Sequence, residues 1–215
     1  MKEKNMEYFK TIMQNARAEV EEKKSRFIAN IFYVESVEEA EQNIKQIKKQ
    51  YFDARHHCYA YRIMDVAGMK EKQSDDGEPS GTAGAPMLNI LQKNELVNVL
   101  VVVTRYFGGT LLGTGGLVRA YSDATLKALL DSGIGEQILG YVMRVVIAYK
   151  DLERFKYYCR KHKISIVKII YEKNIICTIE LTKEEKIKLL EEKQKEIVFL
   201  DNTVLEEKYI KTNME

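Results

Sequence analysis

Residues 105–119 of this 215-residue chain read RYFGGTLLGTGGLVR, and this stretch decides the fold of the region around it. The apolar run at 97–107 predicts a strand that is buried on both faces. Residues 117–131 have a helical pattern, and Gly133 is placed to end that helix. A glycine-rich turn between a buried strand and a helix exposes backbone N–H groups at the positive end of the helix dipole, which suits phosphate or carboxylate.

The glycine segment therefore predicts an anion-binding loop. Glycine permits positive φ and close backbone approach, and flanking arginines bind phosphate through paired hydrogen bonds. The segment has neither the Lys-Ser/Thr of a P-loop nor the spacing of GxGxxG. A tight strand-to-helix turn that binds no ligand explains the glycines equally well. The predicted anion-binding residues are Arg105, Gly108, Gly109, Thr110, Gly113, Thr114, Gly115, Gly116 and Arg119.

A second polar, glycine-punctuated stretch lies upstream, where 66–86 predicts a long loop that leads into a short helix near Pro86. Its three carboxylates would hold magnesium or supply a general base, although a solvated turn is the favoured interpretation. Two adjacent histidines precede it at the start of the strand predicted for 57–64, and they should point to opposite faces. A structural role is favoured for each histidine. The candidate catalytic residues are His56, His57, Asp75, Asp76 and Glu78.

The elements before this loop follow from periodicity and capping. The pattern predicts strands over 8–20 and 26–34. Ser36 with Glu39 forms a capping box that opens a helix to about Tyr51. Its apolar face is expected to hold Val37, Ala40, Ile44, Ile47 and Tyr51.

A new succession of strand and helix patterns begins after residue 135, and it predicts the ferredoxin-like order β-α-β-β-α-β. Asp151 and Thr182 are placed as helix N-caps. The chain is therefore predicted to hold two domains, 1–134 and 136–215. The elements expected in the second domain are strands at 138–148, 164–171, 175–181 and 203–210, with helices at 151–162 and 183–195.

Composition sets limits on function. The formal net charge is +2, from 34 basic and 32 acidic side chains, which argues mildly against a dedicated nucleic-acid binder. The three cysteines are widely spaced and are expected to be buried thiols without a disulfide or a zinc site. The N-terminus does not read as a signal peptide, and no apolar run is long enough to span a bilayer. A cytoplasmic protein without a membrane association is expected, and the oligomeric state is left open.

The two glycine-punctuated stretches together resemble the signature of the IMPACT/YigZ family. The resemblance rests on 74–84, 103–109 and 112–121, and extends over about residues 1–130. It implies an N-terminal α+β sandwich similar to the second domain of a small-subunit ribosomal protein. The C-terminal half resembles, by pattern, the last domain of elongation factor G. The family resemblance implies a link to translation and nucleic acid, and it transfers no catalytic residue.

Three hypotheses for function follow. The leading one is a regulatory binding protein linked to translation that contacts RNA or a ribosome-associated partner through the glycine loop. The rival is a hydrolase or transferase for a small phosphorylated or carboxylated substrate, with a pocket formed by 56–57, 75–78 and 105–119. The third is a protein–protein module. No cofactor is expected under the first, and magnesium belongs only to the second.

Overall fold

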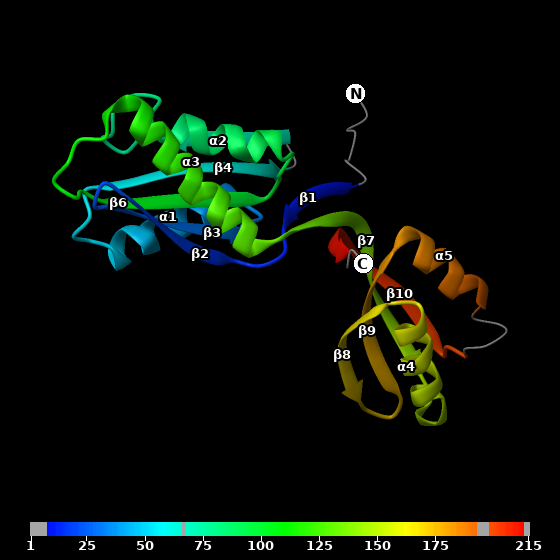
Figure 1. Ribbon diagram of the computed structural model, residues 1–215. Helices are drawn as coiled ribbons and strands as arrows, with labels where there is room; N and C mark the ends of the chain where they lie inside the picture. The colour runs from blue at the N-terminus through cyan, green and yellow to red at the C-terminus, as the bar shows by residue number, and fades with distance from the viewer. Residues whose placement is uncertain (1–7, 66–67, 193–197, 213–215) are drawn as a thin grey trace. The chain divides into compact units, whose positions relative to one another are not determined.

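The computed structural model describes residues 8–65, 68–192 and 198–212. They form two compact units, one within Phe9–Gly135 and the other of Tyr8 with the described residues from Glu136 onward. Each unit combines a sheet with helices, so the predicted α+β class is confirmed (Figure 1). That residues 1–134 and 136–215 are domains that fold independently stays a prediction.

The first unit is built on an antiparallel sheet in the order β2-β3-β6-β4-β5. The middle strand β6 is buried from Val99 to Arg105, because both of its faces are covered. This agrees with the near-continuous apolar run in the sequence. The strands are β2 (Ala16–Glu22), β3 (Ser25–Tyr33), β4 (His56–Asp65), β5 (Gly68–Ser74) and β6 (Val99–Tyr106).

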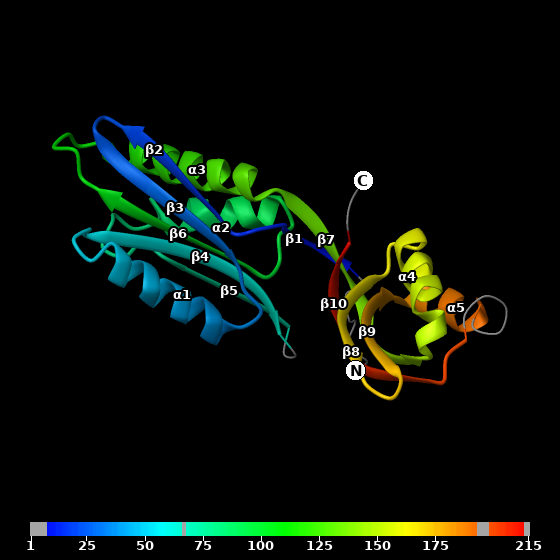
Figure 2. The same cartoon turned by 90° about the horizontal axis from the view of Figure 1, so that it is seen from below.

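Helices cover the two faces of this sheet (Figures 1 and 2). The larger core joins alternate residues of β3, β4 and β6 to buried side chains of α2 and α3. The smaller core joins the remaining alternate residues to Ala40, Ile44 and Ile47 of α1. The helices are α1 (Val37–Gln50), α2 (Gly84–Lys93) and α3 (Gly113–Ser132).

Helix α1 begins at the predicted cap. The N–H of Glu39 donates to Ser36 Oγ at 3.1 Å, and the Glu39 carboxylate accepts from the N–H of Glu35 at 2.8 Å. Two N–H groups at the helix start thus have side-chain partners. The predicted apolar face is confirmed, because it supplies the buried residues of this helix.

Two predictions about the first unit are wrong in detail. The strand predicted for 8–20 is interrupted: β1 (Tyr8–Ile12) is a neighbour of β7, whereas β2 pairs with β3. The loop predicted for 66–86 contains β5, which pairs with β4 at the sheet edge. Most side chains of β5 are exposed and polar, so no apolar alternation marks it. An edge strand with exposed charges is a common protection against aggregation, and hydropathy alone does not reveal it.

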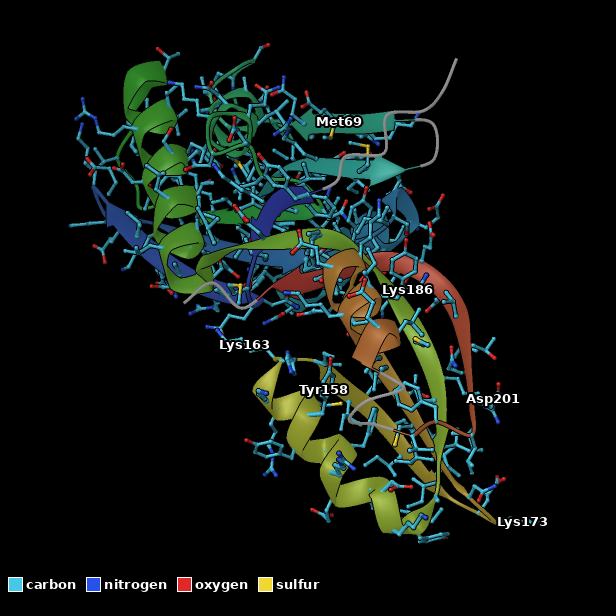
Figure 3. All side chains as sticks on the ribbon, turned by 90° about the vertical axis from the view of Figure 1, so that its right-hand side faces the viewer. Met69, Tyr158, Lys163, Lys173, Lys186 and Asp201 are labelled. Carbon is cyan, nitrogen blue, oxygen red and sulfur yellow. The ribbon has the colours of Figure 1, made fainter. Side chains whose placement is uncertain are left out.

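The second unit has the element order predicted for it, β7-α4-β8-β9-α5-β10. Within its sheet β8 pairs with β9, β9 with β7 and β7 with β10, all antiparallel, which is the ferredoxin-like arrangement. Its core lies between this sheet and the two helices (Figure 3, where Tyr158 marks α4 and Lys186 marks α5). The bounds are β7 (Ile134–Ile147), α4 (Leu152–Lys161), β8 (Ser165–Tyr171), β9 (Ile175–Thr182), α5 (Lys183–Glu192) and β10 (Asp201–Thr212).

The two predicted caps of this unit have different outcomes. Thr182 Oγ1 accepts from the N–H of Glu185 at 3.2 Å, and the Glu185 carboxylate accepts from the N–H of Thr182 at 2.7 Å. Asp151 occupies the N-cap position of α4, but its side chain makes no capping bond. The reason is a 3-10 turn, Tyr149–Asp151, which leads into the helix and leaves Asp151 with helical backbone angles. The predicted N-cap position of Asp151 is therefore confirmed, but the hydrogen bond expected of a capping side chain is absent.

The cysteines behave as the sequence indicates. Cys58, Cys159 and Cys177 are free and buried. Burial raises the pKa of Cys58 and of Cys159 to about 12, so both remain thiols at neutral pH. Across residues 8–65, 68–192 and 198–212, no helix combines the length and hydropathy needed to cross a membrane.

Candidate functional site

The glycine segment connects β6 to α3 at one end of the first sheet. Figures 1 and 2 show its loop projecting from the same end as the β2–β3 turn and the start of β4. Helix α3 begins at Gly113, four residues before the predicted start. The weak helix propensity of glycine conceals this first turn in the sequence. Leu112 at the N-cap makes no side-chain capping bond, so the first turn of α3 has no side-chain cap from that position.

The glycines of this segment do not all serve the same purpose. A Cβ on Gly108 would lie 2.0 Å from the carbonyl carbon of Lys24, so only glycine fits against the β2–β3 turn. Gly109 and Gly113 have positive φ, and a Cβ on either would meet open space. Gly108 is therefore required by close packing in a tight turn, and not by ligand binding. The other two glycines shape an exposed loop whose backbone is open to a ligand.

Arg105 is buried and ion-paired inside the protein. Its Nη1 donates to Glu78 Oε1 at 2.8 Å and Oε2 at 3.1 Å, and both side chains are almost fully buried. Tyr121 Oη also donates to Glu78 Oε1, at 2.8 Å. Cys58 Sγ contacts Tyr121 Oη at 3.3 Å. Arg105 Nη1 and Glu78 thus pair with each other, in place of the external anion predicted for one and the catalytic role considered for the other, and the buried Arg105 Nε has no hydrogen-bond partner among the described residues.

Asp75 caps helix α2 from a distance. Its Oδ1 accepts from the N–H groups of Ala83 at 2.9 Å and Gly84 at 2.8 Å, and its Oδ2 from Gly81 at 2.8 Å. The N-cap residue of α2 itself supplies no side-chain bond. Burial would raise the pKa of Asp75, but the three N–H donors outweigh it and lower the pKa below its usual value. This carboxylate is a structural cap.

Asp76 joins the polar loop to β4 and α1. Its Oδ2 accepts from the backbone N–H of His57 at 2.7 Å, and its Oδ1 from Lys48 Nζ at 2.8 Å. Burial opposes ionisation, yet these two bonds together with the charge of Lys48 lower the pKa of Asp76. Its φ of 42° is unusual for a residue other than glycine, and the surrounding bonds hold it there.

The two histidines have the opposite orientations predicted for them. His57 is buried, and its Nε2 donates to the carbonyl of Tyr51 at 3.0 Å. His56 Nδ1 donates to the carbonyl of Asp76 at 2.9 Å, and the side chain lines a pocket. In the neutral imidazole this bond leaves His56 Nε2 as an acceptor. His57 is structural, whereas His56 is accessible to a ligand.

The pocket has a volume of about 650 Å³ and lies where β4 begins and β6 ends. Tyr106 Oη donates to Asp53 Oδ1 at 2.6 Å, and this bond is the main reason that the pKa of Tyr106 is raised to about 12. Phe107 and Leu111 are 56% and 83% exposed. The side chains that line the pocket include Asp53, Arg55, His56, Arg105, Tyr106, Phe107 and Leu111.

The predicted segments 56–57, 75–78 and 105–119 are thus brought together, but their carboxylates lie outside the pocket lining. Sequence reasoning missed Asp53, Arg55 and Leu111. The signal that could have found Leu111 is a pair of leucines inside a glycine loop, where no core is expected. Thr110, Thr114 and Arg119 are exposed without lining the pocket. In the described part of the chain, no three His, Cys, Asp or Glu residues are grouped to hold a metal ion.

Comparisons with known proteins agree on one family. The profile of the Impact N-terminal domain matches residues 23–129. IMPACT family member YvyE of Bacillus subtilis (strain 168) is 40% identical over 168 residues, which cover 78% of this chain and 76% of the relative. IMPACT family member YigZ of Escherichia coli (strain K12) is 47% identical over 112 residues, which cover 50% of this chain and 53% of the relative. A solved structure of a hypothetical protein superposes with a TM-score of 0.61 and 28% identity, covering 94% of this chain and 98% of the other.

Proposed function

The chain belongs to the IMPACT family, and we propose that it is a regulatory binding protein linked to translation that contacts RNA at the β6–α3 end of its first unit. The link to translation comes from the family resemblance. The choice of RNA comes from the chemistry of the surface beside the pocket.

One observation carries the preference for a binder over an enzyme. Each of the three carboxylates considered for catalysis has an internal partner: Asp75 caps α2, Asp76 holds His57 and Lys48, and Glu78 pairs with Arg105. A general base must be within reach of the proton that it removes, and a magnesium ligand must present a lone pair to the ion. With their oxygens in use and away from the pocket, these groups are poorly placed for either task.

What remains at this end of the unit favours a nucleic acid. Arg55 and Arg119 are exposed and make no ion pair within the described residues. The first turn of α3 lacks a side-chain bond from its N-cap residue, which leaves backbone donors for phosphate. Phe107 offers an exposed ring on which a base can stack. Cationic groups beside an exposed aromatic ring are typical of single-strand binding sites.

Binding of a fluorescein-labelled single-stranded RNA, followed by anisotropy over a salt series, tests the proposal. Arg119→Ala should weaken binding by about 1.5 kcal/mol, the low end for a charge-assisted hydrogen bond, because the side chain is exposed. It should also lower the salt slope by about 0.7, the value for one phosphate contact on a single strand. Arg119→Lys, which keeps the charge, should retain most of the affinity and most of the salt slope.

Arg154→Ala is the matched control, because Arg154 is an exposed arginine on α4 of the second unit. Its affinity should equal that of the unaltered protein. Salt-independent binding, or equal losses for Arg119→Ala and Arg154→Ala, would contradict a phosphate site at the start of α3. Turnover of a phosphoester or dipeptide that depends on His56 would instead favour the enzyme hypothesis.

A further inference from the structure

The pocket beside Phe107 has one wall suited to a planar ring. The guanidinium carbon of Arg105 lies 5.5 Å from the centroid of the Phe107 ring, while the Phe107 side chain remains 56% exposed. Arg105 is ion-paired with Glu78, and its guanidinium lies over one face of the phenyl ring. Leu111 adds a second exposed apolar surface. An aromatic ligand can therefore stack on a ring that is already oriented, which lowers the entropic cost of binding.

The polar side of the pocket presents hydrogen-bond acceptors. Tyr106 Oη donates to Asp53 Oδ1, which keeps a second lone pair, and Asp53 Oδ2 accepts no hydrogen bond from the described residues. Because the pKa of Tyr106 is raised, its hydroxyl stays protonated and keeps this carboxylate in place. His56 Nδ1 is bonded to the carbonyl of Asp76, so the imidazole presents Nε2 to the pocket. Arg55 also lines the pocket and is its exposed cation, whereas the Arg105 side chain is buried.

These groups select among the bases. A carboxylate is matched best by two adjacent N–H donors, and the Watson–Crick edge of guanine supplies N1–H beside an exocyclic amino group. Adenine and cytosine place a ring acceptor beside their amino group, which would face a carboxylate with repulsion. Uracil has one ring N–H between two carbonyl oxygens. The pocket volume of about 650 Å³ is ample for a purine nucleotide.

We propose that this pocket binds the guanine base of a nucleotide, with the base stacked on Phe107, its Watson–Crick edge on Asp53 and its phosphate near Arg55. The inference rests on the proposed function, since a splayed base of single-stranded RNA is the expected source. A free guanine nucleotide has the same chemistry, and the test separates the two.

The full-length protein is titrated with single-stranded RNAs that differ at one central base, guanine, inosine, adenine or uracil, and separately with GMP, IMP and AMP. Guanine should be preferred over adenine by about tenfold, within the range for a paired base contact. Inosine lacks the amino group and should fall between them. Asp53→Asn should abolish the preference for guanine while leaving the salt slope unchanged. Phe107→Ala should weaken the binding of all the RNAs.

Asp131→Asn and Tyr157→Ala are the matched controls, being exposed residues outside the pocket lining, and both should bind like the unaltered protein. RNA binding without a base preference, or a preference that survives Asp53→Asn, would overturn the guanine site and leave the proposed function standing. GMP binding that depends on Asp53, without RNA binding, would support the guanine site and contradict the RNA proposal. Binding of neither would overturn both.

Discussion

At the scale of single residues, the buried ion pair of the first unit joins two side chains that are far apart in the sequence. Arg105 and Glu78 are 27 positions apart, and Tyr121 joins them from α3. The residue types and the neighbourhood were predictable, because both lie in the two glycine-punctuated stretches. Their pairing was not, since it depends on how β6 and the loop before α2 meet in the folded chain.

Loss of Arg105 should therefore act on stability. Arg105→Ala leaves the Glu78 carboxylate buried without its cation, and the free energy of unfolding should fall by about 3–5 kcal/mol. Arg17→Ala is the comparison, because its ion pair with Glu19 is exposed and should be worth at most about 1 kcal/mol. Urea unfolding of both variants measures the two losses. Equal losses would show that Arg105 is not the buried partner of Glu78.

At the scale of elements, the predicted periods of two and 3.6 residues located most strands and helices. The exceptions have local physical causes. Strand β5 carries exposed polar side chains at a sheet edge, and the first turn of α3 is rich in glycine. The cap of α2 was hidden for another reason: Asp75 lies nine positions before Gly84, outside the spacing of local capping motifs.

The Asp75 cap predicts a stability loss that depends on pH. Asp75→Asn should lower the free energy of unfolding by about 1–2 kcal/mol at neutral pH, the usual cost of a lost cap. The pKa of Asp75 is lower in the folded protein than the value of about 3.9 in an unfolded chain. Its contribution is therefore complete above about pH 4 and is lost as the pH falls through the folded pKa.

Urea unfolding at neutral pH and at about pH 3 tests this sign. The difference between the unaltered protein and Asp75→Asn should shrink in acid, because protonation removes the same charge as the substitution. The exposed carboxylate of Asp131 lies near the C-terminal end of α3, and Asp131→Asn should show no such difference. A deficit that grows in acid would contradict the assignment of Asp75 as an ionised cap.

At the scale of the whole molecule, each unit has a core of its own. The first contains the clusters around β6, and the second contains a cluster between the ferredoxin-like sheet and its helices. The boundary near residue 135 was visible in the sequence, because each half has its own succession of strand and helix patterns. The pocket was not, since its lining comes from two segments, 53–56 and 105–111, that strand pairing and the Tyr106–Asp53 hydrogen bond bring together only in the folded chain.

Separate cores predict separate folding. Fragments 1–134 and 136–215 should each give a cooperative thermal transition, followed by circular dichroism. The full chain provides the reference for both transitions. If neither fragment unfolds cooperatively, the two units depend on each other and the two-domain interpretation fails.

The most direct test of the central claim is to map where RNA touches the protein. The full-length protein is irradiated with a bound 4-thiouridine RNA, digested, and the cross-linked peptides are identified by mass spectrometry. The account predicts cross-links on peptides that contain Phe107 or Arg119, and their loss when Phe107→Ala and Arg119→Ala are combined. Cross-links that lie only in other peptides, or that survive this double substitution, would contradict it.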